Sequence, residues 1–158
     1  MSRVSPIPEG VPWLTPHLVV HGAAEAIAFY ARALGTEELY RCVSPDGKTV
    51  IFAELMLGEA RLFVVDEMPG QRALGPLARG GTSVALHLFV PDVDASVERA
   101  TAAGMKVEIP LADFFWGERY CALRDPFGHQ WGLASRREDL SPTEIQRRSN
   151  EFFGRLRA

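Results

Sequence analysis

Two histidines stand at matching points of two similar stretches of this chain. His17 opens HLVV and His87 opens HLFV, and the sequence has only four histidines in 158 residues. An imidazole can bind a metal, transfer a proton or hydrogen-bond a bound molecule. Glu54, in FAEL, supplies a carboxylate that could act beside them. Alternatively, each histidine is a partly buried strand residue that bonds to the backbone or to water.

The elements that must position these side chains occur twice in the same order. Alternating apolar residues predict strands, and apolar residues three or four apart predict helices. In the first half we predict a strand, a helix and three strands, over residues 14–20, 22–35, 37–44, 49–58 and 60–67. In the second half the same order is predicted over residues 83–90, 92–104, 106–115, 119–125 and 130–135.

An internal repeat of this kind is strong information about the fold. We therefore expect an α+β protein with two βαβββ modules, residues 13–67 and 83–138, joined by a Gly- and Pro-rich linker. Their curved mixed sheets would enclose one shared cavity, so that residues 13–138 form a single domain. Residues 139–158 lie outside the repeat and predict an amphipathic helix with Ser141 as N-cap and Pro142 in its first turn. This helix would pack on the body of the protein or on a second subunit.

The bulk properties narrow the classes of function. The net charge of −3 and the absence of a Lys/Arg-rich run argue against nucleic-acid binding. No apolar run approaches the roughly 18 residues that a membrane span needs, and the first residues lack the apolar core of a signal peptide. We therefore expect a cytoplasmic protein without a membrane partner.

The doubled pattern and several short phrases together resemble a known superfamily. The phrases are TPHLVVHGAAEAIAFY, AELMLGEARLFVVDE, LHLFVPDVDA, DPFGHQWGLAS and EDLSPTEI. They are similar to the vicinal oxygen chelate superfamily (glyoxalases, bleomycin resistance proteins and extradiol dioxygenases), and within it to the PhnB-like branch. The resemblance covers about residues 13–150 and implies the fold more than the function, because this fold hosts several reactions and also plain drug-binding proteins.

The resemblance also implies where a divalent metal would be bound. The ligand positions of the first strands fall on Thr15 and Ala85, and those of the last strands fall on about Phe63 and Gly132. These residue types are poor or impossible metal ligands, so the usual site is expected to be absent. His17 and His87 lie two residues beyond the vacated positions, on the same strand face.

Three further residues are expected near a ligand. Phe115 and Trp116 could stack on a flat molecule, although core or interface aromatics need no ligand. Arg119 could bind an anionic oxygen, or it could be a surface residue paired with Glu118 or Asp113. The expected ligand-binding residues are Thr15, His17, Glu54, His87, Phe115, Trp116 and Arg119.

Three hypotheses of function follow. The first is a homodimeric small-molecule-binding protein of the glyoxalase/bleomycin-resistance type that encloses an apolar or aromatic ligand without a cofactor. The second is a metal-dependent lyase or dioxygenase, with a displaced divalent-metal site of His17, Glu54 and His87. The third is a metal-free acid/base enzyme, with His17 or His87 as the base and Arg119 stabilising an oxyanion. Whether the protein is an enzyme is left open.

Overall fold

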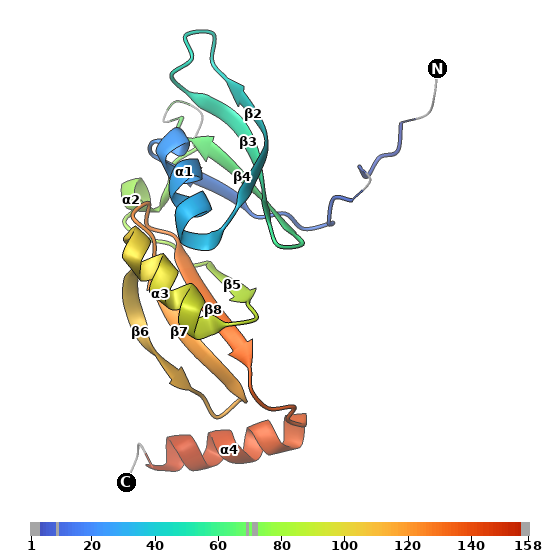
Figure 1. Cartoon of the computed structure of the whole chain (residues 1–158), viewed down its shortest axis with the longest axis vertical. Helices are drawn as coiled ribbons and strands as arrows, with labels where there is room; N and C mark the ends of the chain where they lie inside the picture. Colours follow the sequence, from blue (N-terminus) through green and yellow to red (C-terminus); the bar gives the residue numbers. More distant parts are fainter. Residues whose placement is uncertain (1–3, 9, 69, 71–72, 156–158) are drawn as a thin grey trace. The chain divides into compact units, whose positions relative to one another are not determined.

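The structure is a computed structural model that describes residues 4–8, 10–68, 70 and 73–155. The chain consists of two compact units, residues 1–81 and 82–158, and each has its own four-stranded sheet. Both sheets are mixed, and each is accompanied by a helix in a βαβββ order (Figure 1). The predicted α+β class and the doubled βαβββ order are confirmed. The shared cavity and the single domain over 13–138 stay predictions.

The first module runs through five elements. These are β1 (His17–Val20), α1 (Ala23–Leu34), β2 (Glu37–Val43), β3 (Val50–Leu57) and β4 (Ala60–Asp66). The strand order is β1-β4-β3-β2, with β1 parallel to β4 and the other pairs antiparallel. At the end of β4, the Asp66 carboxylate accepts hydrogen bonds from the backbone N–H groups of Gly22, Ala23 and Val50. Asp66 thereby joins the start of α1 to the start of β3.

The region expected as a plain linker contains structure of its own. A short helix, α2 (Pro76–Arg79), follows Gly75 and ends at Gly80. The Glu67 carboxylate accepts a hydrogen bond from the backbone N–H of Gly75. Within the described part of the chain, no helix is both long and apolar enough to cross a membrane.

The second module repeats the first. Its elements are β5 (Ala85–Phe89), α3 (Val93–Ala103), β6 (Lys106–Asp113), β7 (Glu118–Arg124) and β8 (Gln130–Arg136). The strand order is β5-β8-β7-β6, with β5 parallel to β8. Asp92 caps α3 by accepting a hydrogen bond from the backbone N–H of Ala95, and Gly104 ends the helix with a positive φ. These two residues are the first and the last of the helical segment predicted from the sequence.

Each sheet has one face that packs against its helix and one open face. In β8, Trp131 and Leu133 are buried, as are Cys121 and Leu123 in β7. In β5, His87 and Phe89 alternate with the less exposed Leu86 and Leu88, so the two aromatic residues lie on the open face. Because side chains alternate between the two faces along each strand, every second residue is placed to contact a ligand on the open face.

The C-terminal helix α4 (Pro142–Arg155) is the last described element (Figure 1). The Ser141 hydroxyl accepts a hydrogen bond from the backbone N–H of Glu144, which confirms the expected N-cap. None of the described residues of α4 is buried. Phe152 and Phe153 both contact Phe115 of the same chain, so the helix packs on the second module through this contact. Residues 156–158, which were predicted to belong to this helix, lie outside the described residues.

Candidate functional site

The centre of the second sheet has an open face made of small residues. His87 in β5 pairs with Gly132 in β8, and Gly132 pairs with Ala122 in β7. Ala122 in turn pairs with Ile109 in β6. Because residues that pair across neighbouring strands share a face, a glycine and an alanine separate His87 from Ile109. The middle of this row therefore leaves room above the sheet.

The ring of Tyr120 crosses part of that room. A Cβ atom built on Gly132 would lie 2.6 Å from Cε2 of Tyr120 and 3.2 Å from Nδ1 of His87. The Tyr120 and His87 rings stack with an interplanar angle of 10° and centroids 5.6 Å apart. Gly132 thus accommodates a tyrosine from the neighbouring strand, where the family resemblance would have placed a ligating carboxylate.

Three more rings join this pair on the open face. Phe89 lies 4.8 Å from His87 between ring centroids, and Phe114 and Trp116 lie 5.7 and 6.1 Å from Tyr120. Phe114 and Trp116 also stack on each other, with centroids 4.4 Å apart. We call these five residues the aromatic cluster: His87, Phe89, Phe114, Trp116 and Tyr120. Their rings cover one region of the sheet with flat apolar surface and polar edges.

One carboxylate lies within the aromatic cluster. Glu118 Oε2 accepts a hydrogen bond of 2.9 Å from the Trp116 indole N–H and lies 3.9 Å from His87 Nε2. Burial, followed by the nearby Cys121 and Glu118 groups, raises the pKa of the Tyr120 phenol above its ordinary value. Tyr120 is therefore a neutral hydroxyl at physiological pH, able to donate or accept a hydrogen bond.

A cavity of about 230 Å³ borders the cluster. Tyr120 lines one side of it, and Ala85, Ala122 and Ile109 contribute apolar surface. Glu108 lines it as well, but its carboxylate accepts hydrogen bonds from Arg124 and from the Gln130 side chain. The charged group at this cavity is thus already paired, whereas the apolar walls are free to contact a ligand.

The corresponding row of the first sheet is filled by larger side chains. His17 in β1 pairs with Phe63 in β4, which pairs with Glu54 in β3, which pairs with Tyr40 in β2. His17 contacts Phe63 edge to face, with ring centroids 6.1 Å apart. Glu54 forms a salt bridge with Arg61. Phe63 therefore separates His17 from Glu54, two of the three residues of the displaced metal hypothesis.

The pairing also places the four positions at which the family resemblance implies a metal ligand. Phe63 lies directly beside His17, and Gly132 directly beside His87. Ala85 begins β5, and Thr15 lies two residues before β1. Phenylalanine, glycine and alanine have no ligand atom, and a threonine hydroxyl alone is a weak ligand, so these residues do not fit the family's metal. Among the described residues, no group of three or more His, Cys, Asp or Glu side chains is arranged to hold a metal ion. Because the displaced site draws residues from both units, it stays a prediction.

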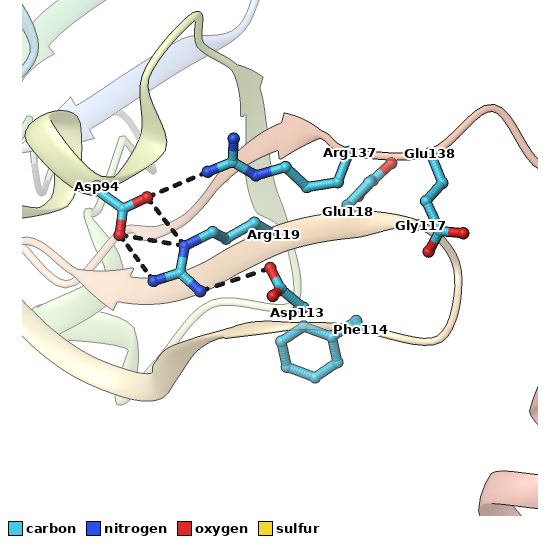
Figure 2. A pocket seen from close by; sticks show the side chains of 8 residues that line it. All are labelled: Asp94, Asp113, Phe114, Gly117, Glu118, Arg119, Arg137 and Glu138. Carbon is cyan, nitrogen blue, oxygen red and sulfur yellow. Dashed lines mark hydrogen bonds and ion pairs between the residues drawn. The ribbon is translucent and has the colours of Figure 1, made fainter.

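Arg119 lies on the opposite face of β7 from Tyr120. Its guanidinium donates three hydrogen bonds, of 2.7, 2.9 and 3.1 Å, to the Asp94 carboxylate of α3 and one of 3.5 Å to Asp113 (Figure 2). Arg137 donates a further hydrogen bond to Asp94, at 3.2 Å. The Arg119 guanidinium holds the pKa of Asp94 below its ordinary value, and Asp94 raises that of Arg119. Of the two readings of Arg119 from the sequence, the arrangement matches the ion-paired one, with Asp94 as an additional partner.

The residues around Arg119 line a second, wide depression of about 530 Å³. Asp113, Arg137 and Glu138 contribute charges of both signs to its walls (Figure 2). Phe114 and Glu118 line it as well, so the depression borders the aromatic cluster. Ion pairs within the chain already use the charges of Arg119 and Asp94. This depression therefore offers less unsatisfied binding surface than the open face does.

The remaining expected residues divide between two places. Trp116 belongs to the aromatic cluster, as expected of a ligand contact, whereas Phe115 turns toward Phe152 and Phe153 of α4. Sequence reasoning did not name Phe89, Phe114, Glu118 or Tyr120 as ligand-binding residues. A signal was present for Phe89 and for Tyr120: Phe89 lies two residues after His87 in a strand, and Tyr120 alternates with the buried Cys121.

Comparisons with known proteins agree with this architecture. The family model "Glyoxalase/Bleomycin resistance protein/Dioxygenase superfamily" matches residues 10–133. The uncharacterized protein Rv0887c of Mycobacterium tuberculosis is 44% identical over 138 residues, which cover 85% of this chain and 81% of that protein.

Solved structures share the fold. TioX from Micromonospora sp. ML1 has a TM-score of 0.63 and 29% identity, over 78% of this chain and 97% of TioX. TnmS3, an antibiotic binding protein from Streptomyces sp. CB03234, has a TM-score of 0.58 and 23% identity, over 77% and 93% of the two chains. The PhnB protein from Bacillus cereus has a TM-score of 0.61 and 18% identity, over 78% and 99%. The last two similarities concern the fold alone. The doubled βαβββ fold, the family match and these relatives together show that the chain belongs to the glyoxalase/bleomycin resistance protein/dioxygenase superfamily.

Proposed function

We propose that this protein binds a small, flat, apolar or aromatic molecule at the open face of its second module. The observation that carries this proposal is the aromatic cluster beside a cavity whose walls include Ala85, Ala122 and Ile109. Ligand pockets are concave and mostly apolar, with a few polar groups that fix orientation. Here the Tyr120 hydroxyl and the Glu118 carboxylate would supply those polar groups.

The relatives support a binding role without determining the ligand. TnmS3, which shares the fold, is described as an antibiotic binding protein. Antibiotics that such a protein binds are small organic molecules, and this class matches a surface of stacked rings better than it matches a charged site. The expected ligand contacts His87 and Trp116 belong to the aromatic cluster, and we retain His17 and Thr15 as expected contacts from the first module.

The experiment is a calorimetric titration with 2-naphthol, a neutral, flat bicyclic compound. We expect saturable binding to the native protein and weaker binding to Trp116→Leu, because the variant loses a ring of the cluster. Arg119→Lys is the matched control, since Arg119 lies on the other face of β7 and should leave the affinity unchanged. If Trp116→Leu binds as tightly as the native protein, or if no binding occurs, the proposal is wrong.

We further propose that the ligand is bound without a metal or another cofactor. The support is chemical: Ala85, Phe63 and Gly132, at three of the four positions implied by the family, have no ligand atom. Elemental analysis after incubation with Zn²⁺, Ni²⁺, Mn²⁺ or Fe²⁺ and dialysis should find less than one metal per chain. Stoichiometric metal that is lost in both His17→Ala and His87→Ala would instead support the displaced site and a lyase or dioxygenase activity.

A homodimer is also proposed. Large apolar residues on the strands outside the proposed ligand site are exposed to solvent, among them Leu39, Val43 and Val107 with 49%, 45% and 49% of their surface accessible. A second copy of the chain could cover such surface, which is costly to leave in water. Light scattering should give twice the mass of the 17.4 kDa chain. A monomeric mass at micromolar concentration would contradict this proposal.

A further inference from the structure

We infer that Gly132 is a positioning residue for the aromatic site, because its missing side chain is what allows Tyr120 to cross β8 and stack on His87. This inference rests on the proposed function as far as ligand binding is concerned. The geometry on which it depends can nevertheless be tested without any ligand. It assigns a role in ligand selection to a residue that cannot itself contact a ligand through a side chain.

The reason for a glycine at this position is space and not backbone conformation. Ten glycines of the described chain have a positive φ, and Gly132 does not belong to them. It lies inside β8, where a glycine weakens a strand because it has no side chain to pack. The backbone conformation therefore does not require a glycine at position 132. The reason must lie in the side chains that surround it.

Those surroundings leave no room for even a methyl group. A Cβ atom at Gly132 would lie 2.6 Å from Cε2 and 3.0 Å from the hydroxyl oxygen of Tyr120, and 3.2 Å from Nδ1 of His87. A carbon–carbon contact of 2.6 Å is about 1 Å shorter than an optimal one, so one of the groups has to move. The two aromatic rings that meet above Gly132 are the same two that stack on each other.

The Tyr120 ring has limited directions in which to yield. Phe114 and Trp116 lie within 6.1 Å of it between ring centroids, and His87 lies at 5.6 Å. Tyr120 also lines the cavity of about 230 Å³. A ring that is displaced from β8 must separate from His87, from its aromatic neighbours or from its place at the cavity wall. Each of these movements changes the surface that the ligand would contact.

The first module shows the alternative arrangement at the same register. Phe63 stands opposite His17, as Gly132 stands opposite His87, and the Phe63 ring itself contacts the histidine. In the second module the ring beside the histidine comes instead from Tyr120, on the next strand. Gly132 therefore distinguishes the two modules and opens only the second row for a tyrosine and a neighbouring cavity.

The test is a double-mutant cycle of Gly132→Ala, Tyr120→Leu and the double variant. The first readout is the NMR chemical shift of the His87 Cε1 proton, assigned with His87→Gln, without ligand. A ring stacked on His87 shifts this proton, so both single variants should move it away from its native value. The double variant should resemble Tyr120→Leu alone, because Gly132 acts through the Tyr120 ring.

The second readout is the affinity for 2-naphthol. Gly132→Ala should weaken binding about fivefold or more, the range that overpacking of a tight site produces. In the Tyr120→Leu background the same substitution should have no further effect. If Gly132→Ala instead weakened the sheet in general, it would lower the affinity both in the native protein and in Tyr120→Leu.

Two other glycines supply matched controls. A Cβ at Gly154 in α4 meets nothing within 4 Å, whereas one at Gly75 lies 2.7 Å from the Val19 carbonyl oxygen in the first unit. Gly154→Ala should change neither readout. Gly75→Ala forces a similarly short contact elsewhere and should leave the His87 proton unchanged.

Every outcome of the cycle decides the inference. If Gly132→Ala does not fold but the double variant does, Tyr120 is the group that Gly132 accommodates and the inference is supported. If neither folds, if the His87 proton does not move in Gly132→Ala, or if the effects are additive, the inference is overturned. If native protein does not bind 2-naphthol, the proposed function fails, whereas the NMR readout still decides the role of Gly132.

Discussion

His87 and Tyr120 stack almost in parallel above β8, with ring centroids 5.6 Å apart and an angle of 10° between their planes. Neither residue would form this pair if the strand beneath them carried a side chain at position 132. The pair joins a histidine from β5 to a tyrosine from β7, two strands that are not adjacent in the sheet. The two matching histidines therefore have different surroundings in the two modules: His17 contacts a phenylalanine, and His87 belongs to the aromatic cluster.

Removing the aromatic surface should weaken ligand binding without unfolding the protein. Tyr120→Leu and Trp116→Leu are each expected to weaken 2-naphthol binding by about two- to tenfold, because an aromatic pair contributes about 0.5–1.5 kcal/mol beyond its buried area. Titration calorimetry measures the affinity, and circular dichroism checks the fold. Equal affinities for native and variant proteins would place the ligand elsewhere.

Arg119 should matter for stability and not for ligand affinity. Arg119→Ala removes the three hydrogen bonds to Asp94 and should lower the melting temperature, as Asp94→Asn should by removing the negative charge that accepts them. The affinity for 2-naphthol should stay within twofold of the native value, an allowance of about 0.4 kcal/mol. A strong loss of binding in Arg119→Ala with an unchanged fold would show that the polar depression of Figure 2 is the ligand site.

The buried Asp125 should be essential for the stability of the second module. Its carboxylate accepts hydrogen bonds from the backbone N–H groups of Phe127 and His129 and from the Trp131 indole N–H. Asp125→Ala leaves these donors without that acceptor, at a cost of about 1–3 kcal/mol for each one that stays buried and unpaired. Urea denaturation measures the loss. Asp46→Ala, in the exposed turn before β3, is the control and should cost far less.

The C-terminal helix should become less stable in acid. Hydrogen bonds from Arg147 and Arg148 lower the pKa of Glu144 from 4.5 to about 2. A carboxylate with a lowered pKa in the folded state stabilises that state above its unfolded pKa, and this contribution is lost as the pH falls from about 4.5 to 2. The protection factors of the α4 amides, which correct exchange rates for the intrinsic effect of pH, should therefore fall over this range.

The Glu144→Gln variant tests the cause of this acid sensitivity. Its α4 amides should already have lower protection factors at neutral pH, and these should change less between pH 4.5 and 2 than in the native protein. Glu59→Gln, in the turn between β3 and β4, should behave as the native protein does. An α4 whose exchange is the same in Glu144→Gln and in native protein would contradict the role of this ion-pair network.

The helices and strands could be predicted well because residues close by in the sequence determine where each begins and ends. The helices α1 and α3 end at Gly35 and Gly104, and α4 begins after Ser141, residues whose conformational or capping preferences are strong. The repeat supplied the topology, since two modules with the same order of elements fold in the same way. The pairing of Phe63 with His17 and of Gly132 with His87, by contrast, came from the structure.

The site was harder to predict because it depends on side-chain direction and on pairs that are distant in the sequence. Phe115 and Trp116 are neighbours, yet Trp116 contacts Tyr120 whereas Phe115 contacts α4. The partner of Arg119 is Asp94, on a helix 25 positions earlier, and spacing alone does not reveal this pair. The sequence showed that Gly132 has no side chain at a position where the family has a metal ligand. Which neighbouring side chain lies over Gly132 depends on the register of β7 against β8.

The most direct test of the binding proposal is an NMR titration of the native protein with 2-naphthol. The indole N–H of Trp116, assigned with Trp116→Phe, and the ring protons of His87 should shift together and saturate. Trp131 also lines the cavity, but its side chain is almost fully buried and its indole N–H is bound to Asp125, so this proton should shift less than that of Trp116. Saturable shifts confined to Trp116, His87 and Tyr120 would place the ligand on the aromatic cluster. An absence of saturable shifts there, or shifts centred on Arg119 and Asp94, would contradict the account.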